Sequence, residues 1–158
     1  MNKDKYVFSQ LTSLLDRSLF NDYVRKYHGD KYVKHFTCWN QLLVLMFGQL
    51  SNRESLRDLI VALEAHRGKC YFLGMGKHIK KFWGTSENAV KTQIYVAIIT
   101  YCLVTVVQHD MRLERSTYEV LQRLSLSLTD KTPLKDLFDK TDYHDVKEQI
   151  DNSELLLF

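Results

Sequence analysis

The sequence contains none of the short motifs that most often reveal an enzyme's active site. There is no GxGxxG dinucleotide fingerprint and no GxxxxGK[ST] phosphate-binding loop, and GMGK at residues 74–77 is only a fragment of such a loop. Single carboxylates such as Asp16 and Asp110 have no second acid beside them, so no ligand set for two-metal catalysis is visible. These absences argue against a nucleotide-dependent enzyme and against a two-metal nuclease.

Cysteine is scarce, and no secretory signal opens the chain. Cys38, Cys70 and Cys102 are an odd number of thiols with no CxxC pair, and residues 1–6 are too polar for a signal peptide. We therefore expect reduced thiols and a cytoplasmic location. Cys102 lies in an apolar run, where a thiolate is disfavoured, and is expected in the core.

Histidine and cysteine offer one candidate metal set. His35 and Cys38, together with His66 and Cys70, are four possible zinc ligands at spacings that zinc accepts. Nothing in the sequence shows that the two pairs meet, so ordinary core or surface roles are favoured.

The apolar run at residues 94–107 is too short to predict a membrane span. It has 14 residues, whereas a spanning helix needs roughly 20. Residues 88–111 contain neither Gly nor Pro and are too many for a strand. A helix over residues 86–108 is predicted instead, and because it is apolar nearly all round, we expect it to be buried on most sides.

The rest of the chain also has helical patterns, and no β-hairpin signal such as Asn-Gly appears. Capping boxes are predicted at residues 51–54 and 116–119, and Pro133 suits a first helical position. His28-Gly29-Asp30 is expected to end a helix. An all-α fold follows, with helices over residues 6–15, 18–27, 38–50, 51–66, 86–108, 116–127 and 133–140. Four glycines at residues 68–84 mark the expected join between two units.

Charge is distributed unevenly between these units. Residues 1–75 carry 11 Lys and Arg against 7 Asp and Glu, a net charge of +4, whereas residues 76–158 carry 11 against 12, a net charge of −1. A modest basic excess permits phosphate contact without requiring it.

The helices on either side of Leu50-Ser51 have a pattern similar to a helix-turn-helix. In that motif the first turns of the second helix face DNA, and Arg53 and Arg57 are predicted to share one face there. A plain α-hairpin with a solvated charged face is the alternative. Further phosphate contacts are expected, interleaved with Tyr27 and Tyr32, from Arg25, Lys26, Lys31 and Lys34.

Several long stretches resemble DDE transposases of the insertion-sequence-four family. GDKYVKHFTCWNQLLVLMFGQLSNRESLRDLIVALEAH at residues 29–66 resembles the start of such proteins, and HIKKFWGTSENAVKTQIYVAIITYCLV at residues 78–104 resembles a segment near their far end. NKDKYVFSQLTSLL, YFLGMGK and RSTYEVLQRLSLSLTDKTPLKDLF add to the likeness, which covers roughly residues 2–145.

The resemblance implies an internally deleted transposase. The family's three catalytic acids bind divalent metal in a ribonuclease-H-like fold, and none of the three motifs that carry them occurs here. We therefore expect that sheet to be absent, the junction to lie at residues 76–78, and no catalytic residue, metal ligand or cofactor. The expected units are residues 1–75, an N-terminal helical domain, and residues 78–145, a remnant of the catalytic domain, followed by a tail at 146–158.

The function expected from this resemblance is binding of transposon-end DNA without catalysis. One alternative is a non-functional remnant that binds nothing. Another is an interaction protein that joins full-length transposase and inhibits it. Self-association is also expected, because the apolar helix has lost the sheet that it would cover, and no membrane partner is expected.

Overall fold

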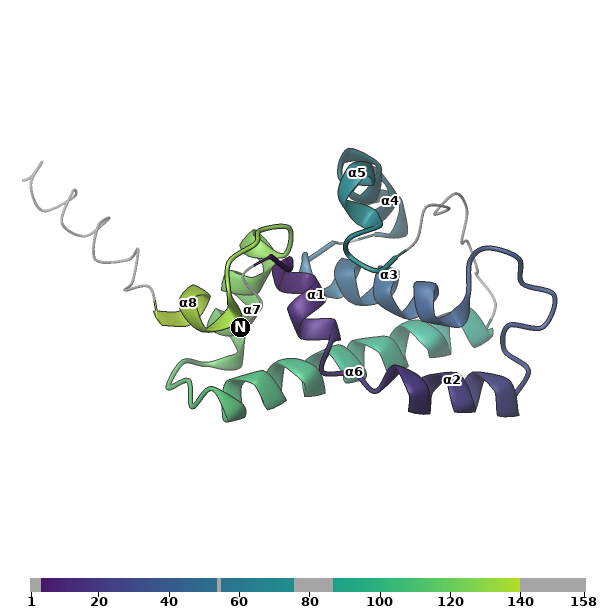
Figure 1. The fold of residues 1–158 in the computed structure, drawn as a ribbon, viewed down its shortest axis with the longest axis horizontal. Helices are drawn as coiled ribbons and strands as arrows, with labels where there is room; N and C mark the ends of the chain where they lie inside the picture. The colour runs from purple at the N-terminus through teal and green to yellow at the C-terminus, as the bar shows by residue number, and fades with distance from the viewer. Residues whose placement is uncertain (1–3, 54, 76–86, 140–158) are drawn as a thin grey trace, which may run out of the picture.

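The computed structural model describes residues 4–53, 55–75 and 87–139, and these are helical with no β-strand among them (Figure 1). The all-α prediction is therefore confirmed. The predicted junction at residues 76–78 and the predicted tail at 146–158 lie outside the described residues. The helices are α1 Val7–Thr12, α2 Arg17–Lys26, α3 Cys38–Leu50, α4 Leu56–Ala65, α5 Arg67–Cys70, α6 Glu87–Asp110, α7 Thr117–Ser127 and α8 Leu134–Asp139.

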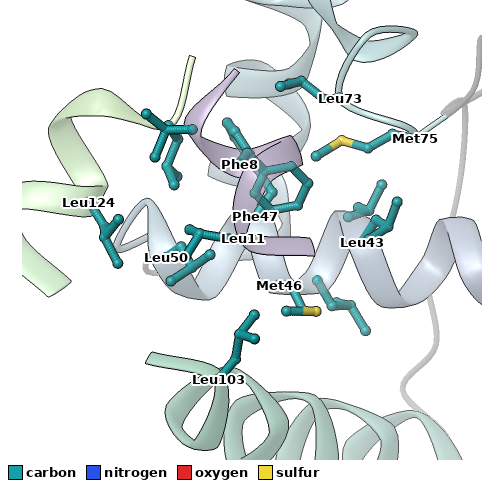
Figure 2. Close-up of a cluster of buried hydrophobic side chains, with 14 of the residues drawn as sticks. Phe8, Leu11, Leu43, Met46, Phe47, Leu50, Leu73, Met75, Leu103 and Leu124 are labelled. Atoms are coloured by element: carbon teal, nitrogen blue, oxygen red, sulfur yellow. The ribbon is translucent and has the colours of Figure 1, made fainter. Parts of the chain in front are cut away.

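Helix α3 is the centre of the core. Thr37 caps its start by accepting a hydrogen bond from the Asn40 N–H at 3.3 Å, and the helix is buried on nearly every side from Leu42 to Gly48. Helix α1 covers one side, where the Phe8 and Phe47 rings meet edge-on with centroids 5.5 Å apart. Helix α6 covers another side (Figure 2). A helix that is apolar all round is stable in water only when neighbours surround it in this way.

Helix α1 is joined to the loop that follows α7 by main-chain hydrogen bonds. This helix has no side-chain cap, and its first N–H groups donate instead to carbonyls after α7: Val7 to Asp130 at 2.8 Å and Phe8 to Leu128 at 3.1 Å. The Gln10 side chain adds a bond to the Thr132 carbonyl at 2.8 Å. Because these bonds satisfy donors that a helix start leaves free, the loop after α7 stabilises the start of α1.

Helix α6 is buried on one face only, so the expectation of burial on most sides is wrong. Its buried residues are Val96, Thr100, Leu103, Val104 and Val107. These face α3 and α7, whereas on the opposite face Ile94, Ile98 and Tyr101 are each more than half exposed. Cys102 lies on that opposite face and is exposed, which corrects its predicted place in the core.

Within the described part of the chain, α6 is the one helix that meets the length and hydropathy criteria for crossing a membrane. Its most apolar window has a mean hydropathy of 1.7, and 28% of that window is buried in the fold. A helix packed in a protein core can meet the same criteria, so this is weak evidence for a membrane span.

Four helix ends share one hydrogen-bonding pattern. In each, a residue with positive φ follows the helix, and the next N–H donates back to the carbonyl five residues earlier in the Schellman arrangement. After α3, for example, Arg53 N–H donates to the Gly48 carbonyl at 3.0 Å. The positive-φ residues at these four helix ends are His28, Asn52, Gly74 and Arg112, and only Gly74 is a glycine.

This pattern corrects the predicted capping box at residues 51–54. Ser51 ends α3, and its hydroxyl donates to the Phe47 carbonyl at 2.7 Å instead of capping the next helix. Ser55 is the cap of α4 and accepts from the Asp58 N–H at 3.1 Å. The second predicted box is confirmed, because Ser116 and Glu119 make both reciprocal bonds at the start of α7.

Candidate nucleic-acid interface

The structure separates the predicted DNA-contacting residues into two groups at opposite ends of α3. Arg25, Lys26, Lys31 and Lys34 belong to the end of α2 and the loop that leads into α3 (Figure 1). Arg53 and Arg57 follow the other end of that helix. Since α3 has 13 residues, its two ends lie about 20 Å apart. The two groups therefore do not form one compact patch.

We call Arg25, Lys26, Lys31 and Lys34 the α2 basic cluster. Asp16 starts α2 by accepting from the Leu19 N–H at 3.0 Å, and the helix ends with two of these cations in its last turn. The following loop is tied to the core, because the Asp30 carboxylate accepts from the Cys38 N–H at 2.7 Å, at the first residue of α3. Local hydrogen bonds thus fix the chain that carries the cluster.

A shallow hollow of about 500 Å³ lies within this cluster. Arg25, Lys31 and the exposed His28 line it, together with Asn21, Val24 and Asp30. The sequence does not single out His28, whose positive φ of 53° turns the chain at the end of α2. In the sequence, the one sign of this role is that His28 lies in the segment expected to end the helix. Glycine is the usual residue at such a turn, which favours Gly29 instead.

Two tyrosines stand beside the lysines of the cluster. The Lys26 ammonium lies 5.4 Å from the Tyr27 ring centroid, and the Lys31 ammonium lies 5.2 Å from that of Tyr32. These rings are 71% and 90% exposed, and the face of each ring that its lysine does not cover is available to a ligand. Cations that neutralise phosphates and rings that stack on bases are the two elements of sequence-independent nucleic-acid binding.

Acidic groups reduce the charge of the cluster. Asp22 pairs with Arg25 across one helical turn, and both side chains remain more than half exposed. Such a surface pair is weak, so a phosphate can compete for the guanidinium. Among the residues that the structure describes, no ion pair joins Lys26, Lys31 or Lys34 to a carboxylate, so these lysines are the principal cations for a ligand.

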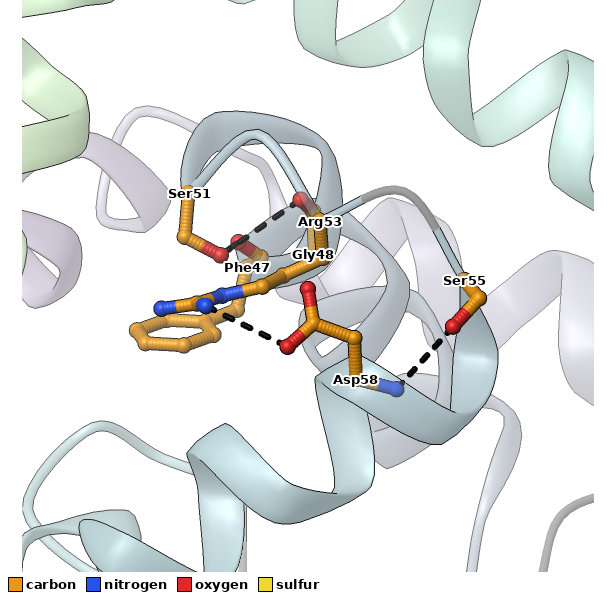
Figure 3. Close-up of polar contacts among 6 residues, drawn as sticks. All are labelled: Phe47, Gly48, Ser51, Arg53, Ser55 and Asp58. Atoms are coloured by element: carbon orange, nitrogen blue, oxygen red, sulfur yellow. Dashed lines mark hydrogen bonds and ion pairs between the residues drawn. The ribbon is translucent and has the colours of Figure 1, made fainter.

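The second group is arranged differently from the prediction. Arg53 lies in the loop before α4, and its guanidinium is 3.4 Å from the Asp58 carboxylate (Figure 3). The prediction that Arg53 and Arg57 share a face of one helix is therefore wrong, because the Schellman ending of α3 occupies residues 51–53. Arg57 lies in the first turn of α4 and is exposed.

The outer face of α4 carries charges of both signs. Arg57, Val61 and Glu64 follow one another at helical spacing and are all exposed. Glu64 would repel phosphates at that face. The α-hairpin alternative accounts for this surface as well as the helix-turn-helix does. If α4 contacts DNA, Arg57 is the cation of this helix that can do so.

The thiols and histidines do not gather into a metal site in the described part of the chain. No group of three or more His, Cys, Asp or Glu side chains there could hold an ion. Burial and the neighbouring Asp30 raise the pKa of Cys38 to about 11, and burial also raises the pKa of Cys70. Neutral thiols of this kind are poor nucleophiles and poor ligands.

The fold and this site define an all-helical protein with an exposed basic and aromatic surface at one end of its central helix. Residues 3–76 match the family described as Domain of unknown function (DUF4372), so this domain is present. No curated protein and no solved structure matches the chain.

Proposed function

We propose that this chain binds DNA through residues 1–75 and does not cut it. The observation that carries the proposal is the α2 basic cluster, where Lys26 and Lys31 lie beside exposed tyrosine rings and Arg25 and Lys31 line one hollow. The DUF4372 domain is found in transposase-like proteins, which supports a role at transposon DNA. The absence of the three acidic motifs from the sequence supports binding without strand cleavage.

The likeness to insertion-sequence-four transposases supports the finer form of this proposal, in which the ligand is a transposon end. An internal deletion that removed the catalytic sheet would leave a DNA-binding domain and a helical remnant. Each lysine that neutralises a phosphate releases a counterion and adds about 0.9 to the salt slope of binding. Binding by a few lysines should therefore be weak at physiological salt and strong at low salt.

The test compares two triple variants with the same loss of charge. Lys26, Lys31 and Lys34 are replaced with alanine in one, and the exposed Lys91, Lys131 and Lys135 in the other. Fluorescence anisotropy with a labelled DNA duplex should show that the first change weakens binding at least tenfold more and reduces the salt slope by about 2–3. Equal losses in both variants would mean that only net charge matters, and the proposed site would be wrong.

A separate double variant, Arg53→Ala with Arg57→Ala, tests the α4 contribution. We expect a smaller loss than for the cluster, because Arg53 is already paired with Asp58. A loss larger than that of the lysine variant would instead place the main DNA contact at the helix-turn-helix.

Inhibition of full-length transposase is a second candidate function, and the exposed apolar face of α6 favours it. Such a surface can bind a related chain in place of a normal partner. Co-purification of the two proteins from cells that make both would support this function, and its absence would remove the support.

A further inference from the structure

The solvent-facing side of α6 has an apolar stripe. Residues three and four apart along a helix share a face, and Ile94, Ile98, Tyr101 and Thr105 follow that spacing. Tyr95 and Cys102 lie beside them, and we call these six residues the outer face of α6. Its four largest apolar side chains are between 54% and 63% exposed.

This face is large for a surface that remains in water. A large side chain offers roughly 150–250 Å². With the flanking Val90, Ile99 and Val106, each between 38% and 50% exposed, the apolar surface is on the order of 600 Å². That is the upper end of the range for patches on monomers and approaches the roughly 800 Å² that each partner contributes to a standard interface.

The polar atoms of this stripe do not oppose burial. The Thr105 hydroxyl donates to the Tyr101 carbonyl of its own helix at 2.7 Å, so its methyl group can be buried without leaving a donor unpaired. The tyrosines combine a wide ring with a hydroxyl that can remain at the rim, which is why tyrosine is enriched in interfaces.

We infer that the outer face of α6 binds the same face of a second copy of this chain, with the two helices antiparallel. The charges at the two ends of α6 select this direction. A two-fold axis between Ile98 and Tyr101 brings the start of α6, where Glu87 pairs with Lys91, beside the end of the partner's α6, where the exposed Arg112 follows the helix and lies opposite Glu87. Each contact occurs twice in the symmetric pair.

A parallel pair would have the opposite electrostatics. Glu87 would then face Glu87, and Lys91 would face Lys91, at the start of the same stripe. Antiparallel helices also bring the positive end of each helix dipole beside the negative end of the other. The apolar stripe therefore supplies the contact, and the terminal charges fix its direction.

Light scattering of the full chain over a concentration series tests whether the dimer forms. The wild type should pass from monomer to dimer within the micromolar range, and Ile98→Lys should stay monomeric. Val61→Lys is the matched control, since Val61 is 60% exposed on α4, outside the stripe, and Ile98 is 54% exposed. Circular dichroism checks that each variant keeps its helices.

A charge exchange tests the direction of the helices. Glu87→Lys should raise the dissociation constant about tenfold, because two attractive pairs become repulsive. Adding Arg112→Glu should restore the wild-type value in an antiparallel dimer. If the double variant does not recover the wild-type dissociation constant, the antiparallel arrangement is wrong. In a parallel dimer no recovery is expected, because both substitutions would leave like charges facing each other.

Three results would overturn the proposed interface. One is a wild type that remains a monomer at all concentrations, and another is a dimer that persists in Ile98→Lys. The third is flotation of the wild type, but not of Ile98→Lys, with phosphatidylcholine vesicles while the protein in solution stays monomeric. That last result would assign the same face to lipid.

Discussion

Two helical glycines, Gly48 in α3 and Gly68 in α5, allow the packing of α4 on α3 to be tested by the same chemical change. A Cβ at Gly48 would lie 2.8 Å from Cδ2 of Leu59, which is 2% exposed and is the point where α4 lies against α3. A Cβ at Gly68 in α5 would meet nothing within 4 Å. Replacing either glycine with alanine increases helix propensity by about 1 kcal/mol, so any difference between the variants reports the contact with Leu59.

The expected magnitudes follow from these contacts. Gly68→Ala should increase the free energy of unfolding by about 0.5–1 kcal/mol. Gly48→Ala has the same intrinsic gain but forces an overpacked contact that costs about 1–3 kcal/mol, so it should be about 1 kcal/mol less stable than the wild type. The two variants should therefore differ by about 2 kcal/mol.

Urea denaturation followed by circular dichroism measures this difference. Adding Leu59→Val to Gly48→Ala should recover part of the loss, because the shorter side chain makes room for the new methyl group. If Gly48→Ala proved as stable as Gly68→Ala, the close approach of α4 to α3 would be wrong. The position of Arg57 relative to the core would then be wrong with it.

Three further predictions concern the core, the thiols and catalysis. Phe8→Ala should lower the free energy of unfolding by about 3–5 kcal/mol in urea denaturation, because Phe8 is fully buried against Phe47. In dilute protein at pH 8, iodoacetamide should modify the exposed Cys102 first. Cys38, whose pKa is raised to about 11, should react at an appreciable rate only as the pH approaches that value, as mass spectrometry can measure. Purified protein should not nick or join DNA with Mg²⁺ or Mn²⁺ in a gel assay, and activity that depended on a carboxylate of this chain would contradict this.

Local signals in the sequence predicted most of the helices. The predicted bounds of α3 agree with the structure, because Thr37 caps its start and apolar residues continue to Leu50. The start of α7 was equally well specified, since Ser116 and Glu119 make a reciprocal box that competes with no other local pattern. In both cases the determining contacts lie within one helical turn.

The prediction of a capping box in SNRE, residues 51–54, is wrong because two local patterns compete there. A serine followed three residues later by glutamate favours a helix start, yet a serine after an apolar helix can also bond back to a carbonyl of that helix. The second arrangement occurs, and Asn52 adopts the left-handed conformation that completes the helix end. Asparagine is the residue most often used there after glycine, and that was the signal available in the sequence.

The burial of α6 and the shape of the candidate site depend on tertiary contacts. The composition of α6 indicates an apolar helix but does not say how many neighbours it has. The prediction that Cys102 lies in the core is wrong for this reason, because Cys102 is exposed. The cations of the α2 basic cluster were found from the sequence. Their hollow with His28, and their separation from Arg57 by the length of α3, follow only from the fold.

The salt dependence of DNA binding by the unmodified chain is the most direct test of the proposed function. Fluorescence anisotropy with a labelled duplex should show a measurable affinity at 50 mM salt. If about four cations contact phosphates, that affinity should fall roughly 100-fold between 50 and 200 mM salt, a slope of about −3.6. No binding at 50 mM salt, or an affinity that does not change with salt, would contradict the proposal that this chain binds DNA through its basic surface.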